Sequence, residues 1–420
     1  MVDAAAVVVP GRGPARAADL AEPADEDKPG LDQAALGAVR LATLDTPPWV
    51  RALGWVGVIA LIYLLITAVS VIGRGFSGLS GDAAQSLFAF AANPWVGLFV
   101  GVLSTVLIQS STTTTAITVT AVGAGALPLA SAVPILFGAN VGTTLTSTLI
   151  ALGYIGNRRE YRRALEASSI HDFYNWLALL VFFPIELAFQ PLQRLSGALA
   201  DVLYGTSLMP DPAGFNLVRT ITRPVVNVIT GATANLDALL GPLVAIVIGA
   251  SMIFAAVKLL GKLLKRLMVG RARDLLTRAA GRNSTVGVVT GTGVTFVTQS
   301  STVTTSILIP FAAGGFLTSK QLYPITVGAN IGTTFTTVLA AFAVIGQDAR
   351  IGLQAAFVHL LFNLLSLLVI YVIPLLRPVP LRCAEALARV ASARTWVIGV
   401  YVAACYVVIP ALVILLVGVL

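Results

Sequence analysis

The sequence has few charged residues, few histidines and few cysteines. Only 11% of its 420 residues are Asp, Glu, Lys or Arg, whereas a soluble domain carries about 25%. From Pro94 to Gly156 there is no charged side chain at all. Because 57% of the residues are hydrophobic and the mean hydropathy is +0.89, the composition excludes a soluble globular protein and predicts an integral membrane protein.

The cysteines and the net charge exclude two further classes. Cys383 lies in a basic segment and Cys405 in an apolar run, so neither a disulfide nor a metal-binding cluster is expected. No cofactor is expected either. The formal net charge of +8 would suit nucleic acid, but the basic residues gather in short segments between apolar runs, where they orient membrane helices. We therefore expect a lipid bilayer as the surroundings and no nucleic acid as a partner.

A polar stretch occurs twice in the chain. Residues 109–115 read QSSTTTT and residues 299–305 read QSSTVTT, and each is followed by a second motif, GANVGTT at 138–144 and GANIGTT at 328–334. Both motif pairs are 190 positions apart, and residues 101–153 and 291–343 agree at 22 of 53 positions without a gap. Polar residues are costly inside a membrane, so their presence in both copies indicates a duplicated functional unit.

Many of the apolar runs are shorter than the roughly 20 residues that a spanning helix needs. Runs such as 95–108 and 286–298 end at Gln, Ser or Thr, which predicts half-helices and re-entrant hairpins. We therefore expect an all-α polytopic membrane protein with two inverted-topology repeats, re-entrant helical hairpins and discontinuous helices.

The basic residues predict the orientation of the segments. Loops at 157–163 and 262–282 are rich in Arg and Lys and should lie inside, whereas 190–235 and 346–351 are not and should lie outside. A basic loop after the first copy and a neutral one after the second is what an inverted repeat predicts. His171 and Asn175 are echoed by His359 and Asn363, here at an offset of 188.

The domain organisation follows from these segments. We expect a disordered cytoplasmic tail at 1–50, a first transmembrane repeat at 51–189 and an extracellular linker at 190–235. A second transmembrane repeat is expected at 236–376, and a basic loop with one final transmembrane helix at 377–420.

The repeated motifs predict an ion site, with Gln109 and Gln299 as buried amides at helix breaks and a further break at each Gly-Ala-Asn-X-Gly-Thr-Thr motif. Gln, Ser, Thr and Asn supply neutral oxygens, which suit a hard cation such as sodium, while amide groups at half-helix N-termini suit an anion. In the two motif regions the only charged residue is Lys320. An oxyanion bound there would lack a neutralising Arg or Lys, and burying it unpaired costs several kcal/mol. The chemistry therefore favours cation–anion symport, and sulfate or arsenate would satisfy the same donors as phosphate.

Two other interpretations compete with transport. Ser110 and Ser300 would need a base for catalysis, and His171 and His359 are the candidates; a duplicated hydrolase site is not expected, so we predict a protein that is not an enzyme. Alternatively, Ser and Thr runs cap their own carbonyls or pack helices. We consider that alternative open for 113–115 and 304–305. The motif glycines Gly138, Gly142, Gly328 and Gly332 are expected to have backbone roles. The repeated His and Asn residues are expected to have structural roles.

The paired Gln-Ser-Ser and Gly-Ala-Asn-X-Gly-Thr-Thr motifs, with the segment HDFYNW at 171–176, resemble the type II sodium–phosphate cotransporters over about residues 95–375. The resemblance implies inorganic phosphate as the substrate and sodium as the driving ion. The segment 190–235 is short and lacks cysteine, unlike the large outer loop of the animal members, which indicates a compact bacterial member in the inner membrane. By motif, it implies a sodium site at Gln299, Ser300, Thr333 and Thr336, and phosphate at Ser110, Ser111, Thr112, Ser301 and Thr302. The repeat extends the predicted phosphate set to Gln109, Asn140, Ser300 and Asn330, and the sodium set to Gln109, Thr143, Thr144, Thr334 and Asp172.

Asp172 breaks the internal symmetry, because the second copy has Leu360 at the matching position. An acid at membrane depth is a functional candidate, and the structural alternative is a salt bridge with Arg162 or Arg163 or a hydrogen bond within the helix. An extra carboxylate could hold one additional sodium ion. The resemblance implies the same, since family members with this Asp are electrogenic and those with Gly are electroneutral.

Overall fold

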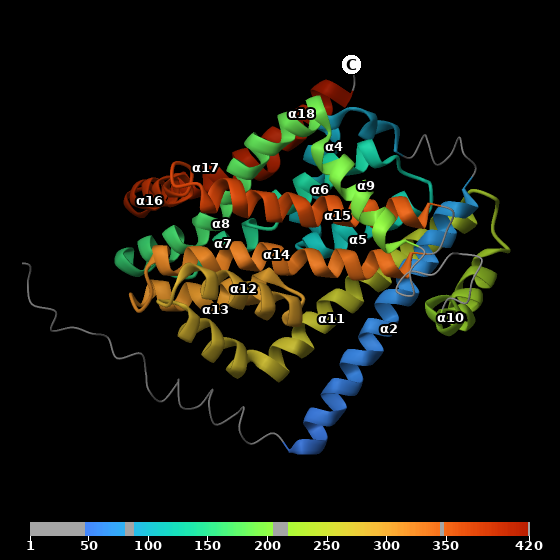
Figure 1. Cartoon of the computed structure of the whole chain (residues 1–420), viewed down its shortest axis with the longest axis horizontal. Coiled ribbons are helices and arrows are strands. Elements are labelled where there is room, and N and C mark those ends of the chain that lie inside the picture. Colours follow the sequence, from blue (N-terminus) through green and yellow to red (C-terminus); the bar gives the residue numbers. More distant parts are fainter. Residues whose placement is uncertain (1–46, 80–87, 205–216, 345–347, 419–420) are drawn as a thin grey trace, which may run out of the picture. The chain divides into compact units, whose positions relative to one another are not determined.

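The computed structural model describes residues 47–79, 88–204, 217–344 and 348–418 (Figure 1). All the described elements belong to one compact unit, Thr46–Leu420. The predicted cytoplasmic tail therefore lies almost wholly outside the described residues. Within the described ranges every regular element is a helix, which confirms the predicted all-α class.

The first half of the described chain contains eight helices and one short 3-10 turn. They are α2 (Pro48–Gly78), η1 (Ala89–Ala92), α4 (Pro94–Ile108), α5 (Ser111–Gly123), α6 (Leu129–Gly142), α7 (Leu145–Leu152), α8 (Arg158–Phe189), α9 (Pro191–Leu203) and α10 (Leu217–Thr233).

The second half repeats part of this order and adds a C-terminal group. It contains α11 (Leu240–Ala279), α12 (Ser284–Thr298), α13 (Ser301–Ala313), α14 (Ser319–Ala343), α15 (Ala349–Ser366), η2 (Leu367–Val372), α16 (Pro378–Ala393), α17 (Trp396–Ala403), η3 (Ala404–Val408) and α18 (Ile409–Gly418). The segments η2 and η3 are π-helical.

Seven described helical segments are long and apolar enough to cross a bilayer. Three further apolar helices, α4, α12 and α13, have only 13 to 15 residues, about 20 to 23 Å at 1.5 Å per residue. That is shorter than the roughly 30 Å hydrocarbon core. The chain is thus a multi-pass membrane protein with spanning helices and shorter pieces, as predicted.

Helices α2 and α11 pack in antiparallel directions and form the most extensive helix contact (Figure 1). A Cβ added at Gly75 would lie 2.7 Å from Ile246, and one added at Gly54 would lie 2.7 Å from Leu267. A Cβ at Gly249 would lie 2.5 Å from Ile72. The small residues therefore let the two backbones approach closely, as in membrane helix pairs generally.

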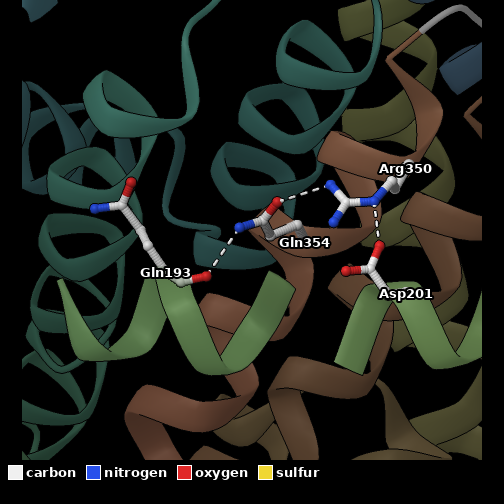
Figure 2. Close-up of polar contacts among 4 residues, drawn as sticks. All are labelled: Gln193, Asp201, Arg350 and Gln354. Atoms are coloured by element: carbon white, nitrogen blue, oxygen red, sulfur yellow. Dashed lines mark hydrogen bonds and ion pairs between the residues drawn. The ribbon is translucent and has the colours of Figure 1, made fainter. Parts of the chain in front are cut away.

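Helix α9 lies on α15 through a chain of polar contacts (Figure 2). The Nε of Arg350 donates to Asp201 at 2.6 Å, its Nη1 donates to Gln354 at 3.4 Å, and Gln354 donates to the carbonyl of Gln193 at 2.9 Å. The Arg350 hydrogen bond lowers the pKa of the exposed Asp201 carboxyl. Two segments predicted to lie on the same side, 190–235 and 346–351, therefore touch.

Several predicted loops are helical. Residues 158–163 form the first turns of α8, most of 262–282 continues α11, and the basic segment after 377 is α16. The described parts of the 190–235 linker are α9 and α10. The prediction that these segments are loops was wrong. Arg and Lys are good helix formers, so a run of basic residues shows that a segment is polar but does not show that a helix ends there. The sidedness of these segments remains a prediction.

Candidate functional site

Both Gln-Ser-Ser motifs form helix breaks. Gln109, between α4 and α5, has φ 57°, and Gln299, between α12 and α13, has φ 54°. Left-handed backbone is uncommon outside glycine. Each following serine caps the next helix: Ser110 accepts from the amide of Thr113 at 3.2 Å, and Ser300 accepts from the amide of Val303 at 3.4 Å. The predicted discontinuous helices are therefore present in both copies.

Each glutamine side chain is held by the same two bonds. The Nε2 of Gln109 donates to the carbonyl of Val106, and its Oε1 accepts from Thr146 at 3.0 Å. The Nε2 of Gln299 donates to the carbonyl of Phe296, and its Oε1 accepts from Thr336. All these partners are 190 positions apart, so the duplication extends to individual hydrogen bonds. Thr336 was a predicted site residue, whereas Thr146 was missed although the offset pointed to it.

The motif glycines bring the helices of each copy together. A Cβ at Gly138 would lie 1.9 Å from the carbonyl oxygen of Leu98, and one at Gly328 would lie 2.1 Å from that of Val288. Gly142 and Gly332 have comparable restrictions, with contacts of 2.8 and 2.6 Å to the backbone or to a threonine. Contacts under 3.0 Å cannot be accommodated without shifting the backbone, so the predicted backbone role of these glycines is confirmed.

The two breaks face one cavity of about 270 Å³. Nine of the predicted site residues line it: Gln109, Ser110, Ser111, Thr112, Thr143, Gln299, Ser300, Ser301 and Thr302. The N-termini of α5 and α13 both open onto it, since Ser111 and Ser301 are their first residues. Residues from both copies thus meet at one place, and their roles as ligands stay predictions.

Two predicted properties of the site were wrong. Gln109 is exposed and Gln299 is half-buried, whereas both amides were expected to be buried. The cavity also has cations beside it, because Lys258, Lys262 and Lys265 of α11 line its wall. The repeated motifs themselves lack positive charge, but α11 packs against α5, α12 and α13 and brings its lysines to them.

Asn140 and Asn330, two predicted phosphate ligands, do not line the cavity. Each is buried and faces the His–Asn pair of the other copy. Asn330 bonds to His171 and donates to Asn175 at 2.5 Å. Asn140 receives hydrogen bonds from Asn363 at 3.3 Å and, at 3.4 Å, shares one with His359. These hydrogen bonds join the two copies, and the roles of Asn140 and Asn330 as phosphate ligands stay predictions.

The second motif has different backbones in the two copies. In the first copy the helix is interrupted at Thr143–Thr144, between α6 and α7. In the second copy α14 continues through 328–334, so the predicted break is absent there. Thr333 and Thr334 donate to the carbonyls of Ala329 and Ile331 in their own helix. These two predicted sodium ligands, with Thr144 and Thr336, lie outside the cavity wall.

Asp172 is fully buried and bound by hydroxyl groups. It accepts hydrogen bonds from Thr144 at 2.9 Å and from Tyr401 and Tyr406 of the last span. The ion pairs found among the described residues do not include Asp172, so the salt-bridge alternative with Arg162 or Arg163 is not supported. The carboxylate does not line the cavity, but it contacts the Thr144 that follows cavity-lining Thr143.

The fold and the site define a polytopic α-helical membrane protein with a cavity between two repeated helix breaks. A sequence model described as Na+/Pi-cotransporter matches residues 64–209 and 252–372. The chain belongs to this family.

Curated relatives agree with this assignment. The chain is 30% identical over 427 residues to sodium-dependent phosphate transport protein 2A of Mus musculus, covering 84% of this chain and 66% of that protein. It is 28% identical over 441 residues to sodium-dependent phosphate transport protein 2B of Homo sapiens, covering 84% of this chain and 63% of that protein. The chain therefore spans slightly less than two thirds of the length of these relatives. No solved structure matches the chain.

Proposed function

We propose that this protein is a secondary active transporter that takes up inorganic phosphate together with sodium. The observation that carries the proposal is the cavity, to which both Gln-Ser-Ser breaks contribute matching side chains. Membership of the Na+/Pi-cotransporter family and the names of the relatives support phosphate and sodium as the transported ions. Under this proposal the protein is not an enzyme, sodium is its coupling ion and it needs no cofactor.

The cavity offers suitable groups for both ions. Phosphate would lie between the N-termini of α5 and α13, where free backbone amides and the hydroxyls of Ser111, Thr112, Ser301 and Thr302 can donate to its oxygens. Sodium would bind to neutral oxygens near Gln299 and Ser300 and, by repeat, near Gln109. In this arrangement the positive charge of sodium offsets the charge of the oxyanion.

Alternating access would follow from an inverted repeat. The antiparallel α2 and α11 and the matched bonds of Gln109 and Gln299 support a two-fold relationship between the halves. A second pair of contacts agrees: Thr115 bonds to Thr337 at 2.8 Å, and Ser147 donates to Thr305 at 3.1 Å. These hydroxyl pairs, again offset by 190, join the two halves of the protein. We infer a bacterial inner-membrane location, with 157–163 and 262–282 inside and 190–235 outside.

Asp172 supports an electrogenic cycle. A buried carboxylate that accepts hydrogen bonds from the hydroxyls of Thr144, Tyr401 and Tyr406 could accept one further sodium ion. With a divalent phosphate, a third sodium would make each cycle carry one net positive charge. Transport of another small oxyanion, such as sulfate, is the alternative function.

Uptake of labelled phosphate into proteoliposomes tests the proposal. An inward sodium gradient should drive accumulation, whereas replacing sodium by potassium or choline should abolish it. Excess sulfate should leave the uptake unchanged if phosphate is the substrate. Uptake without sodium, or inhibition by sulfate as strong as that by unlabelled phosphate, would contradict the proposal.

A further inference from the structure

The cavity has a charged wall that the paired Gln-Ser-Ser breaks do not explain. Helix α11 contributes Phe254, Val257, Lys258, Gly261, Lys262 and Lys265 to the lining. Residues spaced by three and four positions share one face of a helix. The three lysines, hereafter the lysine row, therefore stand one turn after another along the face that α11 turns toward the cavity.

The lysine row has no protein counter-charge at the cavity. The lining residues include no Asp or Glu. Among the described residues, the ion pairs are Arg350–Asp201 and Arg389–Glu385, and neither involves the row. Lys258 instead lies 5.0 Å from the centre of the Phe254 ring. Like charges at this spacing repel one another, so an anion with more than one charge would relieve the repulsion.

The lysine row also breaks the internal repeat. The positions 190 residues earlier are Ala68, Ile72 and Gly75 of α2, which are buried. Two of them, Ile72 and Gly75, pack directly against α11. The positive charge thus lies on one flank of an otherwise two-fold arrangement of neutral donors. The neutral donors can bind any oxyanion, whereas the positive charge of the lysine row favours the oxyanions that carry more negative charge.

We propose that the lysine row is an anion-binding wall that selects multiply charged oxyanions and draws them into the cavity. The inference rests on the proposed function, because the oxyanion it would select there is phosphate. Since the basic end of α11 is predicted to lie inside, the row would act on the cavity when it opens to that side. Under this proposal Lys258, Lys262 and Lys265 determine which oxyanions bind, a role that the neutral side chains of the repeated motifs cannot supply.

Equilibrium binding tests the wall without transport. Thermal unfolding of the purified protein would be followed against phosphate concentration at fixed sodium and ionic strength. The triple variant Lys258→Gln, Lys262→Gln, Lys265→Gln should need about ten-fold more phosphate for the same stabilisation. The triple Lys→Arg variant should resemble wild type. Arg266→Gln, a charge loss on the same helix outside the cavity wall, should also resemble wild type.

Ionic strength and anion valence add a second readout. Raising the salt from about 0.05 to 0.5 M should reduce the difference between wild type and the triple Gln variant, because exposed charges are screened beyond about 10 Å at 0.1 M. Changing the pH changes the ratio of divalent to monovalent phosphate. Wild type should bind the divalent form more tightly, and the triple Gln variant should lose this preference. A merely structural role of the lysines would lower the unfolding temperature without phosphate and leave both preferences unchanged.

The outcomes separate the wall from the transport proposal. If phosphate stabilises wild type and the Arg variant but only weakly the Gln variant, the wall is supported. If the Gln variant binds phosphate as wild type does, or wild type does not bind it, the wall is overturned. If wild type binds phosphate through the row yet shows no sodium-dependent uptake, the wall stands and the transport proposal fails.

Discussion

The hydroxyl of Thr146 lies 3.0 Å from the Oε1 of Gln109 and donates a hydrogen bond to it. Thr336 makes the same bond to Gln299. In each copy the second polar motif thus ends two residues before a threonine that hydrogen-bonds to the glutamine of the first motif. The two motifs of a copy are therefore linked by a hydrogen bond. This bond fixes the side chain of the glutamine whose left-handed backbone forms the helix break at the cavity.

Replacing either glutamine should abolish transport. In Gln109→Ala and Gln299→Ala the threonine hydroxyl loses its acceptor, which costs about 1–3 kcal/mol where the group is buried, and the cavity loses an amide oxygen. The measurement is phosphate uptake by protein that still inserts and purifies normally.

Gln190→Ala is the matched control for these variants. Gln190 has φ 52° at the end of α8 but does not line the cavity. Gln190→Ala therefore places alanine at the same kind of left-handed backbone position but leaves the cavity wall unchanged. Uptake near the wild-type rate in Gln109→Ala or Gln299→Ala would assign that glutamine to packing alone.

Two glycines of α12 should respond in opposite ways to alanine. A Cβ at Gly291 would lie 2.1 Å from the carbonyl oxygen of Ile325, whereas nothing lies within 4 Å of one at Gly293. Gly291→Ala should force α12 away from α14 and destabilise by about 1–3 kcal/mol or more. Gly293→Ala should be neutral or slightly stabilising, since alanine favours helix by up to about 1 kcal/mol.

Thermal unfolding in detergent compares the two variants. We expect a midpoint lower by several degrees for Gly291→Ala and an unchanged or higher midpoint for Gly293→Ala. Equal midpoints for both variants would show that the close approach of α12 and α14 is not needed for stability.

Asp172 should couple the cycle to the membrane potential. Asp172→Gly removes the carboxylate proposed to hold an additional sodium ion, so sodium-dependent uptake should persist but lose its response to potential. The measurement is uptake into proteoliposomes with and without a valinomycin-imposed, inside-negative potential.

Tyr406→Phe serves as the control, because it removes one hydrogen bond to Asp172 but keeps the charge. This variant should still respond to the potential. A wild type that ignores the potential, or an Asp172→Gly variant that responds like wild type, would exclude Asp172 as the extra ligand.

The inverted repeat predicts opposite sides for equivalent segments. In a background with Cys383 and Cys405 replaced by serine, Arg159→Cys should react with an impermeant thiol reagent only from inside. Asp348→Cys should react only from outside. Labelling of both positions from the same side would disprove the inverted arrangement.

Much of the cavity could be predicted from the sequence because its chemistry is duplicated. Gln109 and Gln299 stand out as polar residues that end apolar runs, and the constant offset pairs their neighbours. The motif glycines were likewise predicted to have backbone roles, and the structure shows that these roles are close approaches between helices. Both inferences depend on local sequence, which determines where a helix breaks and which faces can approach.

Other features depend on tertiary packing and could not be predicted. The lysines of α11 lie 34 to 41 positions before Gln299, and the packing of α11 against α5, α12 and α13 brings them to the cavity. Thr143 and Thr144 bond to carbonyls of their own helix just as Thr333 and Thr334 do, but Thr144 also donates to Asp172, a residue that the second copy lacks. Asn330 contacts His171 and Asn140 contacts His359. The sequence showed only that the two histidines occupy similar positions in the two copies.

The central claim is that sodium and phosphate move together through the cavity between Gln109 and Gln299. Its most direct test is the reverse coupling: an inward phosphate gradient imposed on proteoliposomes with equal sodium on both sides. Wild type should then accumulate labelled sodium, and the Gln109→Ala, Gln299→Ala double variant should not. Sodium movement that is the same with and without the phosphate gradient would contradict coupled transport.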